Sequence, residues 1–182
     1  MRRRSTDAVI ARFAVKLVTM VQPIKIRRAL VADAPDVYAV LMAAKKDIPL
    51  VAFDDDKGRG LVRDKCRDRK VWVAEIDGNL AGVALLGLSI WCLPYVPEIS
   101  YLATVNEYRR RDVASTLVRY AVKVIYQRDR NGVIVEVWDR NLPTIELLTK
   151  ERFKPHPTRQ KPKPQGQDPR PYFVTYFLGD VP

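Results

Sequence analysis

The sequence predicts a mixed α/β fold with a central, mostly antiparallel sheet that contains one parallel β-α-β unit and splayed central strands. Two observations indicate this class. Apolar segments bounded by turn residues predict strands, and segments with apolar residues at helical spacing lie between them. An unbroken apolar strand also follows a crossover helix, which is typical of parallel strands buried on both faces.

Length and composition indicate a single domain. The chain has 182 residues, of which 47% are hydrophobic and 29% charged, and we expect one domain over residues 24–182. No apolar run approaches the ~20 residues needed to span a bilayer, so no membrane partner is expected. The two cysteines and the single histidine lie in unrelated contexts, which indicates neither a disulfide framework nor a metal site. A cytoplasmic protein is therefore predicted.

The net charge of +11 lies mostly in the flanks of the chain. Residues 1–23 hold five basic side chains and one acidic one, and residues 154–170 hold the same numbers. Residues 24–153 hold 22 basic against 18 acidic side chains. Because this central part is only mildly basic, a nucleic-acid-linked substrate remains an alternative and not the leading interpretation.

Residues 1–23 form a basic N-terminal extension whose role stays open. The segment lacks a long apolar stretch followed by a small-residue cleavage site, which disfavours a secretory signal. An additional docked helix is one interpretation. A true start at Met20 is the other.

The first elements are a strand, a helix and a charged segment. Residues 24–29 alternate weakly and predict a strand. Asp33 is placed as the N-cap of a helix with Pro35 in its first turn. The apolar stripe of this helix consists of Val37, Val40, Leu41 and Ala44. Residues 53–69 predict a loop with a short helix at about 61–67.

A hairpin follows, in which residues 71–76 and 80–89 form strands around Asp77-Gly78-Asn79. Pro94 and Pro97 are expected to break the run from Ile90 and to set off a strand that begins near Glu98. The rest of the chain predicts a helix over 113–126, a strand over 133–138, a short helix over 141–151, a mobile basic Pro-rich loop over 154–171 and a strand over 172–178.

Three consecutive arginines stand where the strand beginning at Glu98 turns into the next helix. The first turn of a helix presents unpaired N–H groups and the positive end of the helix dipole, which suit a phosphate or pyrophosphate. Arg109, Arg110 and Arg111 would add positive charge to this site. The alternative interpretation is a solvated basic turn between two core elements.

This region resembles the GNAT superfamily of N-acetyltransferases. Arg109-x-x-Asp112-x-Ala114 is similar to the family motif Gln/Arg-x-x-Gly-x-Gly/Ala, with Asp112 in the place of its first glycine. Asn141 to Phe153 is similar to Asn-x-x-Ala-x-x-Leu-Tyr-x-Lys-x-Gly-Phe, with Leu148 in the place of the tyrosine and Arg152 in the place of the glycine. The resemblance implies a GNAT-like fold that binds acetyl-CoA as co-substrate and uses no metal.

The resemblance also implies which residues bind acetyl-CoA. The backbones of Leu102 and Thr104 would pair with the pantetheine arm, and Asn141 would contribute to the same site. Either Arg110 or Arg111 could also meet the 3′-phosphate. The expected pyrophosphate cradle consists of Arg109, Arg110, Arg111, Asp112, Val113, Ala114 and Ser115.

Glu98 is the expected general base, because the histone-acetylating branch of the family carries its catalytic glutamate at this position. The alternative interpretation is that Glu98 simply ends a strand at the surface and has no catalytic role. The Thr104 amide is a candidate oxyanion donor. Alternation along the strand places Tyr101 on the opposite side from Glu98, in the core. With Leu148 in place of the family tyrosine, no dedicated acid for the CoA thiolate is expected.

Asp112 departs most from the family pattern, because a carboxylate beside a pyrophosphate is repulsive. Asp is one of the few non-glycine residues that tolerate left-handed φ, and it also caps helix N-termini. We therefore expect Asp112 to hold the backbone shape of the family glycine.

These observations predict an N-acetyltransferase that acts on a primary amine by direct attack in a ternary complex. The acceptor is a small molecule or a protein, and residues 46–70, which would select it, carry no readable motif. One alternative is a weak or inactive binding module of this fold that recruits an acidic partner. Another is acetylation of a nucleic-acid-linked amine. The sequence leaves the oligomeric state open, with a homodimer as one alternative.

Overall fold

The structure is a computed structural model that describes residues 22–45, 56–89, 96–127, 132–156 and 173–179. Residues 1–21 of the basic extension, Cys92 and residues 157–171 of the Pro-rich loop lie outside this description. The domain boundaries drawn from the sequence therefore stay predictions.

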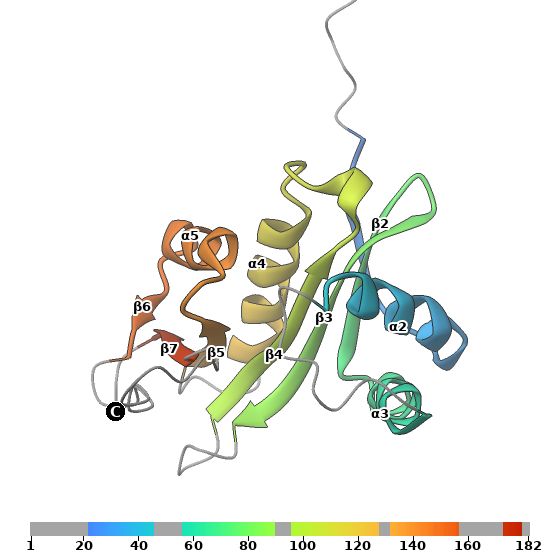
Figure 1. Ribbon diagram of the computed structural model, residues 1–182, viewed down its shortest axis with the longest axis horizontal. Coiled ribbons are helices and arrows are strands. Elements are labelled where there is room, and N and C mark those ends of the chain that lie inside the picture. Colours follow the sequence, from blue (N-terminus) through green and yellow to red (C-terminus); the bar gives the residue numbers. More distant parts are fainter. Residues whose placement is uncertain (1–21, 46–55, 90–95, 128–131, 157–172, 180–182) are drawn as a thin grey trace, which may run out of the picture.

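The described strands form one mixed sheet of seven strands, which confirms the predicted fold class (Figure 1). Its spatial order is β1-β2-β3-β4-β5-β7-β6. All neighbours pair antiparallel except β4 and β5, which are parallel. The strands are β1 (Lys25–Arg28), β2 (Val71–Ile76), β3 (Asn79–Ser89), β4 (Val96–Thr104), β5 (Val133–Trp138), β6 (Lys154–Pro155) and β7 (Phe173–Leu178).

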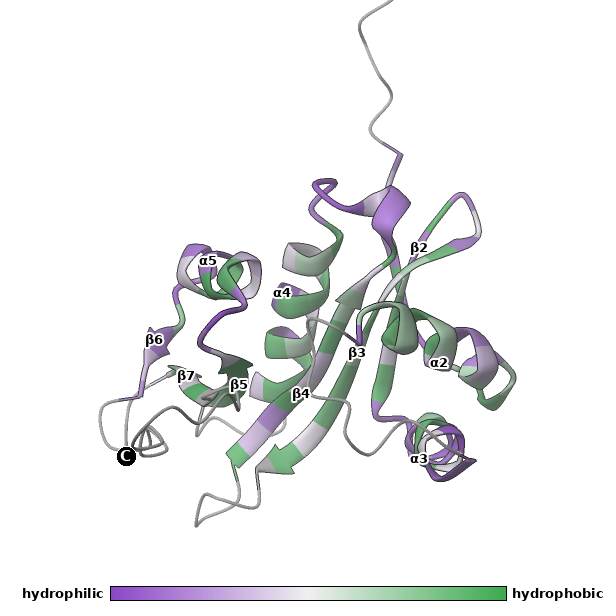
Figure 2. Cartoon of the chain, in the orientation of Figure 1, coloured by the Kyte–Doolittle hydropathy of each residue, from purple (hydrophilic) through white to green (hydrophobic). Residues whose placement is uncertain are grey.

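Helices pack on both faces of the sheet. On one face α2 (Ala34–Ala43) and α3 (Asp56–Arg67) share a core with β2 and β3. On the other face α4 (Val113–Tyr126) and α5 (Leu142–Lys150) share a core with β5 and β7. Their apolar residues face the sheet and their hydrophilic residues face outward, as Figure 2 shows. Short 3₁₀ turns, η1 (Val31–Asp33) and η2 (Asn106–Tyr108), precede α2 and α4.

Helix α3 is longer than the sequence predicts. A helix was expected only over residues 61–67, with a loop that contains two glycines before it, but the helix begins at Asp56. Gly58, Val62 and Cys66 recur at every fourth residue and are buried against the core shared with α2. Burial of this stripe outweighs the ~1 kcal/mol by which each glycine disfavours a helix.

Strand β4 begins earlier than expected and contains a bulge. Pro97 was predicted to break the chain, but it pairs with Leu88 inside β4. The register with β3 shifts so that Ser100 is an extra residue between Ile99 and Tyr101. A bulge of this kind reverses the alternation of side chains along the strand.

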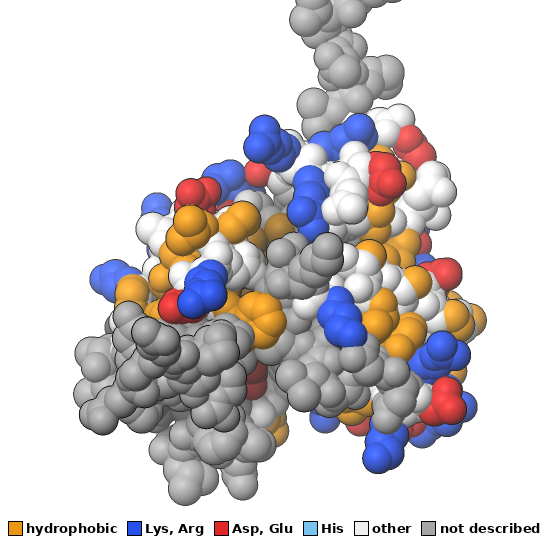
Figure 3. Space-filling model, viewed as in Figure 1, with side chains coloured by type: hydrophobic (Ala, Val, Ile, Leu, Met, Phe, Trp, Pro, Cys, Tyr) orange, Lys and Arg blue, Asp and Glu red, His pale blue; other side chains and the backbone are white. Residues whose placement is uncertain are grey.

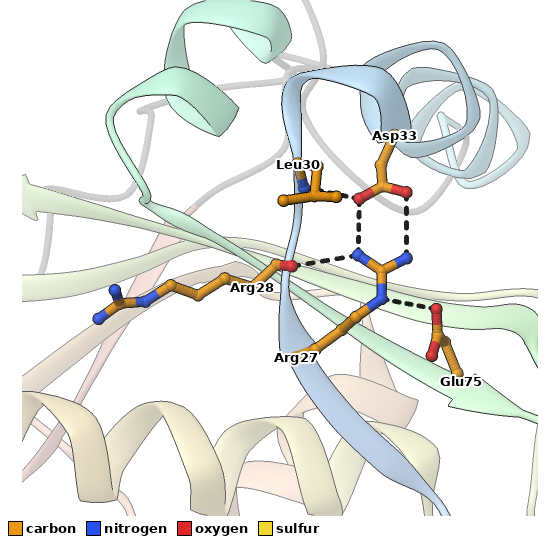
Figure 4. Close-up of polar contacts among 5 residues, drawn as sticks. All are labelled: Arg27, Arg28, Leu30, Asp33 and Glu75. Carbon is orange, nitrogen blue, oxygen red and sulfur yellow. Dashed lines mark hydrogen bonds and ion pairs between the residues drawn. The ribbon is translucent and has the colours of Figure 1, made fainter.

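A charged network fastens β1 to the rest of the fold (Figure 4). The Arg27 guanidinium donates to both carboxylate oxygens of Asp33, at 2.6 and 3.0 Å, and to Glu75 at 2.7 Å. Asp33 stands at the predicted N-cap position of α2, but its side chain does not cap that helix. It accepts instead from the Leu30 N–H at 2.6 Å. Asp33, which was expected to cap α2, therefore helps to link β1, η1 and β2 instead.

Candidate active site

Strands β4 and β5 diverge toward the C-terminal end of β4. The register of the described residues pairs Glu98 of β4 with Ile134 of β5 and records no further pair. From Ile99 to Thr104, β4 remains paired with β3 on its other side. Because β5 does not cover this stretch, the backbone of Leu102 and Thr104 lies beside an opening between two central strands. The predicted splay is thereby confirmed.

The opening leads to the N-terminus of α4. Arg110 and Asp112 both have left-handed backbones, with φ of 60° and 57°. For Asp112 this is the left-handed φ that an aspartate was expected to tolerate there. The turn reverses the chain so that the first N–H groups of α4, on Val113, Ala114 and Ser115, begin the helix at the cleft. Basic side chains gather around this end of the molecule (Figure 3).

The Asp112 side chain pairs with a lysine of α5 instead of capping the helix that it precedes. It makes no capping bond to α4, which departs from the capping role considered for it. Its Oδ1 lies 3.2 Å from the Lys150 Nζ at the end of α5. The negative charge is therefore paired with a cation from a second element.

A cleft of about 660 Å³ occupies the space between these elements. Nine of the ten residues predicted to bind acetyl-CoA line it, and they come from β4, the loop before α4, α4 itself and the start of α5. These nine are Leu102, Thr104, Arg109, Arg110, Asp112, Val113, Ala114, Ser115 and Asn141.

The tenth residue, Arg111, does not line the cleft. Its guanidinium lies 5.5 Å from the centre of the Tyr108 ring, a cation–π arrangement. Of the two arginines considered for the 3′-phosphate, Arg110 lines the cleft and Arg111 does not. Three charged or aromatic lining residues were missed by sequence reasoning, namely Tyr108, Arg140 and Glu146. Arg140 stands directly before Asn141, and that adjacency is the signal that could have identified it.

Asn141 has a structural role in addition to lining the cleft. It is the N-cap of α5, and its Oδ1 accepts from the Thr144 N–H at 3.2 Å. This bond fixes the start of α5 at the wall of the cleft. The amide therefore shapes the site through the helix that it caps.

The two remaining departures from the family pattern have different structural outcomes. Leu148 is fully buried in the core between α4, α5 and the sheet, so its position offers no polar group to the cleft. Arg152 has a φ of 68°, the backbone shape that a glycine would adopt most easily. Arg152 and Asp112 thus both have left-handed backbones at the positions where the family pattern has glycine.

Glu98 lies at the closed end of the splay and is half-buried. Glu98 does not line the cleft, because the part of β4 that lines it runs only from Leu102 to Thr104. The prediction that Tyr101 faces the opposite side is wrong, because the bulge at Ser100 intervenes. Tyr101 packs against the core formed by α2 and α3, as expected of a core residue. Burial and the charge of Glu98 raise the pKa of the Tyr101 phenol, and the pKa of Lys65 on α3 is lowered by burial.

In the part of the chain that the structure describes, no three potential metal ligands come together. Within those same residues, no helix is long and apolar enough to cross a bilayer.

Comparison with known proteins gives a consistent result. The model of the Acetyltransferase (GNAT) family matches residues 35–153. No curated protein matches the sequence. An N-acetyltransferase from Staphylococcus aureus Mu50 is similar in structure, with a TM-score of 0.71 and 20% identity over 86% of this chain and 98% of that one.

Two further structures share the fold. A ribosomal-protein-alanine N-acetyltransferase from Brucella melitensis has a TM-score of 0.68 and 19% identity, over 85% of this chain and 98% of that one. A diaminobutyrate acetyltransferase from Paenibacillus lautus, solved with L-2,4-diaminobutyric acid and coenzyme A, has a TM-score of 0.63 and 13% identity, over 88% and 99%. At these identities the likeness extends to the fold alone.

Proposed function

Because the chain belongs to the Acetyltransferase (GNAT) family, we propose that it transfers the acetyl group of acetyl-CoA to a primary amine. The observation that carries the proposal is the cleft where the diverging strands β4 and β5 meet the N-terminus of α4. It combines an uncovered strand edge with a positively polarised helix end, and these two features suit an amide-containing arm that ends in a pyrophosphate.

The residues around the cleft fit acetyl-CoA. The N–H groups at the start of α4 would hold the pyrophosphate, and Arg109, Arg110 and Arg140 would supply positive charge. The edge of β4 at Leu102 and Thr104 would pair with the pantetheine amides as an added strand does. This arrangement directs the thioester along β4 toward Glu98.

The reaction that we propose is direct attack in a ternary complex. The acceptor nitrogen forms a bond to the acetyl carbon, and the bond from that carbon to the CoA sulfur breaks. Glu98 accepts the proton of the amine, directly or through one water, and the Thr104 amide would donate to the oxyanion. The electron pair of the broken bond leaves on the CoA thiolate, a tolerable leaving group that water can protonate.

The test combines binding with catalysis. Acetyl-CoA is titrated by calorimetry, and CoA release is measured with a panel of primary amines for the natural chain and for Glu98→Gln. We expect Glu98→Gln to retain acetyl-CoA binding and to lower kcat by about 10²- to 10⁴-fold, the usual contribution of a general base. The loss should be smaller at high pH, where more of the amine is already deprotonated.

The matched control is Glu136→Gln, a half-buried glutamate on the neighbouring strand β5 that, like Glu98, does not line the cleft and that is assigned no role in the reaction. It should leave CoA release unchanged. Absence of acetyl-CoA binding would refute the enzyme proposal and favour the inactive binding module. Binding without CoA release from any amine would count against Glu98 as base and against the panel's class of acceptor.

A further inference from the structure

A second hollow, called the groove below, lies outside the cleft and is lined by residues of η1, α2 and α3. It measures about 640 Å³, nearly the size of the cleft. Val31, Ala34 and Pro35 form its apolar side, while Arg59 and Arg63 line it from α3. The groove and the cleft share no lining residue. It is therefore a separate feature with its own chemistry.

The apolar side of this groove is unusually open to solvent. Val31 is 46% exposed, and the neighbouring Leu30 is 65% exposed. Leu61, which follows the lining residue Gly60, is 37% exposed. These three are among the five exposed large hydrophobic residues of the described chain. Of the three, Val31 lines the groove itself, while Leu30 and Leu61 are sequence neighbours of lining residues. Exposed apolar surface is typical of interaction sites when it is contiguous.

The charged side of the groove is partly organised before any ligand arrives. The Arg59 guanidinium lies 5.4 Å from the centre of the Tyr38 ring, which holds it over the groove. Arg63 stands four residues further along α3 and so projects from the same side. Helix α3 as a whole holds five basic and two acidic residues. Figure 3 shows basic and hydrophobic side chains next to one another at this corner of the molecule.

Gly60 leaves the groove open where a side chain would fill it. A Cβ built at Gly60 would meet no atom within 4 Å, although the residue lies inside a helix. Every residue except proline would be a better helix former, by up to about 1 kcal/mol. The glycine therefore costs stability locally and keeps the groove accessible.

We propose that this groove binds an acidic peptide segment of a partner protein. Carboxylates of the peptide would pair with Arg59 and Arg63, and an apolar side chain beside them would cover Val31 and Pro35. Asp56 also lines the groove and would repel phosphates and carboxylates alike, so it does not distinguish the two ligands. A nucleic acid fits less well because the apolar side at Val31, Ala34 and Pro35 offers a sugar–phosphate backbone nothing. The proposal does not depend on catalysis in the cleft.

The experiment uses Gly60 as a plug. A random peptide library displayed on phage is panned against the full chain and, in parallel, against Gly60→Leu, whose side chain would occupy the groove. Gly60→Ala, which adds only the Cβ, is the matched control. We expect peptides that combine Asp or Glu with an apolar residue to be enriched on the natural chain and on Gly60→Ala, but not on Gly60→Leu.

The selected peptide is then synthesised and titrated. Arg63→Glu should weaken its binding by about tenfold or more, as expected for a charge-assisted contact that becomes repulsive. Acetyl-CoA binding, measured on the same variants, should not change. Enrichment of basic peptides, or of none, would overturn the proposal. It would equally be overturned if a labelled single-stranded RNA bound the natural chain and lost that binding in Gly60→Leu while no acidic peptide was enriched.

Discussion

At the scale of single residues, Asp112 bears the main electrostatic conflict of the site. Its backbone supplies the left-handed turn before α4, and its carboxylate lies at the cleft where an anion is proposed to bind. Lys150 relieves part of this conflict, with its Nζ 3.2 Å from the Asp112 Oδ1. Both side chains are exposed, so the pair is worth at most about 1 kcal/mol.

A double-variant experiment measures this relief. Asp112→Asn keeps a residue that tolerates positive φ and removes the charge, and it should strengthen acetyl-CoA binding by about threefold. Lys150→Ala should weaken binding by a similar factor in the natural chain and have little effect in the Asp112→Asn background. Calorimetry at low and high salt checks both points, because screening should shrink the effects. An equal loss in both backgrounds would mean that Lys150 acts on the ligand directly.

Arg152 offers a second test of a strained residue. Its φ of 68° is costly for a side chain with a Cβ, so Arg152→Gly should raise the free energy of unfolding by about 1 kcal/mol. Urea denaturation is the measurement. Lys123→Gly is the control, since the same change within α4 should lower that free energy by about 1 kcal/mol. Destabilisation by both substitutions would show that the Arg152 side chain contributes more than its backbone costs.

At the scale of elements, the position of the α4 N-terminus depends on close packing against β3. A Cβ at Gly82 would lie 2.8 Å from the Val113 side chain and 2.9 Å from the Ala103 carbonyl oxygen. Both the first turn of α4 and the backbone of β4 are packed, so moving either one to make room for a Cβ would cost stability. Gly82 therefore sets how near the first turn of α4 comes to the sheet, and with it the depth of the cleft.

Gly82→Ala should accordingly lower the free energy of unfolding by about 1–3 kcal/mol and weaken acetyl-CoA binding as α4 shifts. Gly60→Ala is the matched comparison, because a Cβ there meets nothing within 4 Å and should stabilise the chain. Thermal unfolding with and without acetyl-CoA distinguishes the two effects. If Gly82→Ala bound acetyl-CoA as the natural chain does, the depth of the cleft would not depend on this contact.

At the scale of the whole molecule, the charged network of Arg27, Asp33 and Glu75, which links β1, η1 and β2, makes the free energy of unfolding depend on pH. The Arg27 guanidinium lowers the pKa of the Asp33 carboxyl from its ordinary 3.8. A carboxyl with a lowered folded pKa stabilises the protein above the unfolded pKa and loses that contribution as pH falls through the folded value. The contribution of Asp33 is therefore full near neutral pH and fades below about pH 4.

Asp33→Asn should lower the free energy of unfolding by about 2 kcal/mol at pH 7. The gap between the variant and the natural chain should narrow steadily as the pH falls below about 4. Urea denaturation over a pH series checks this. A gap that stayed constant down to the lowest pH would show that Asp33 acts through neutral hydrogen bonds and not through its charge.

The order of strands and helices, and most of the residues around the cleft, could be predicted from the sequence. The exception is β6 (Lys154–Pro155), which pairs with β7 although its residues were expected to begin a mobile loop. Local signals carried the correct predictions: the Asp77-Gly78 turn, the stripe of α4 and the short motif from Arg109 to Ala114 each act within a few residues. The errors arose where tertiary contacts override local preference. Pro97 pairs inside β4, and α3 begins at Asp56 despite two glycines, because burial against the sheet outweighs propensity.

The sequence by itself determined the fold class, the family and the loop that begins α4, since periodicity and a short motif are properties of the chain alone. Only the tertiary structure decided that Arg111 packs on Tyr108 and does not line the cleft, that Lys150 pairs with Asp112 and that Tyr101 shares a face with Glu98. Each of these depends on a contact across elements or on a single extra residue in β4. Such contacts are set by packing in three dimensions, and no local pattern of residues encodes them.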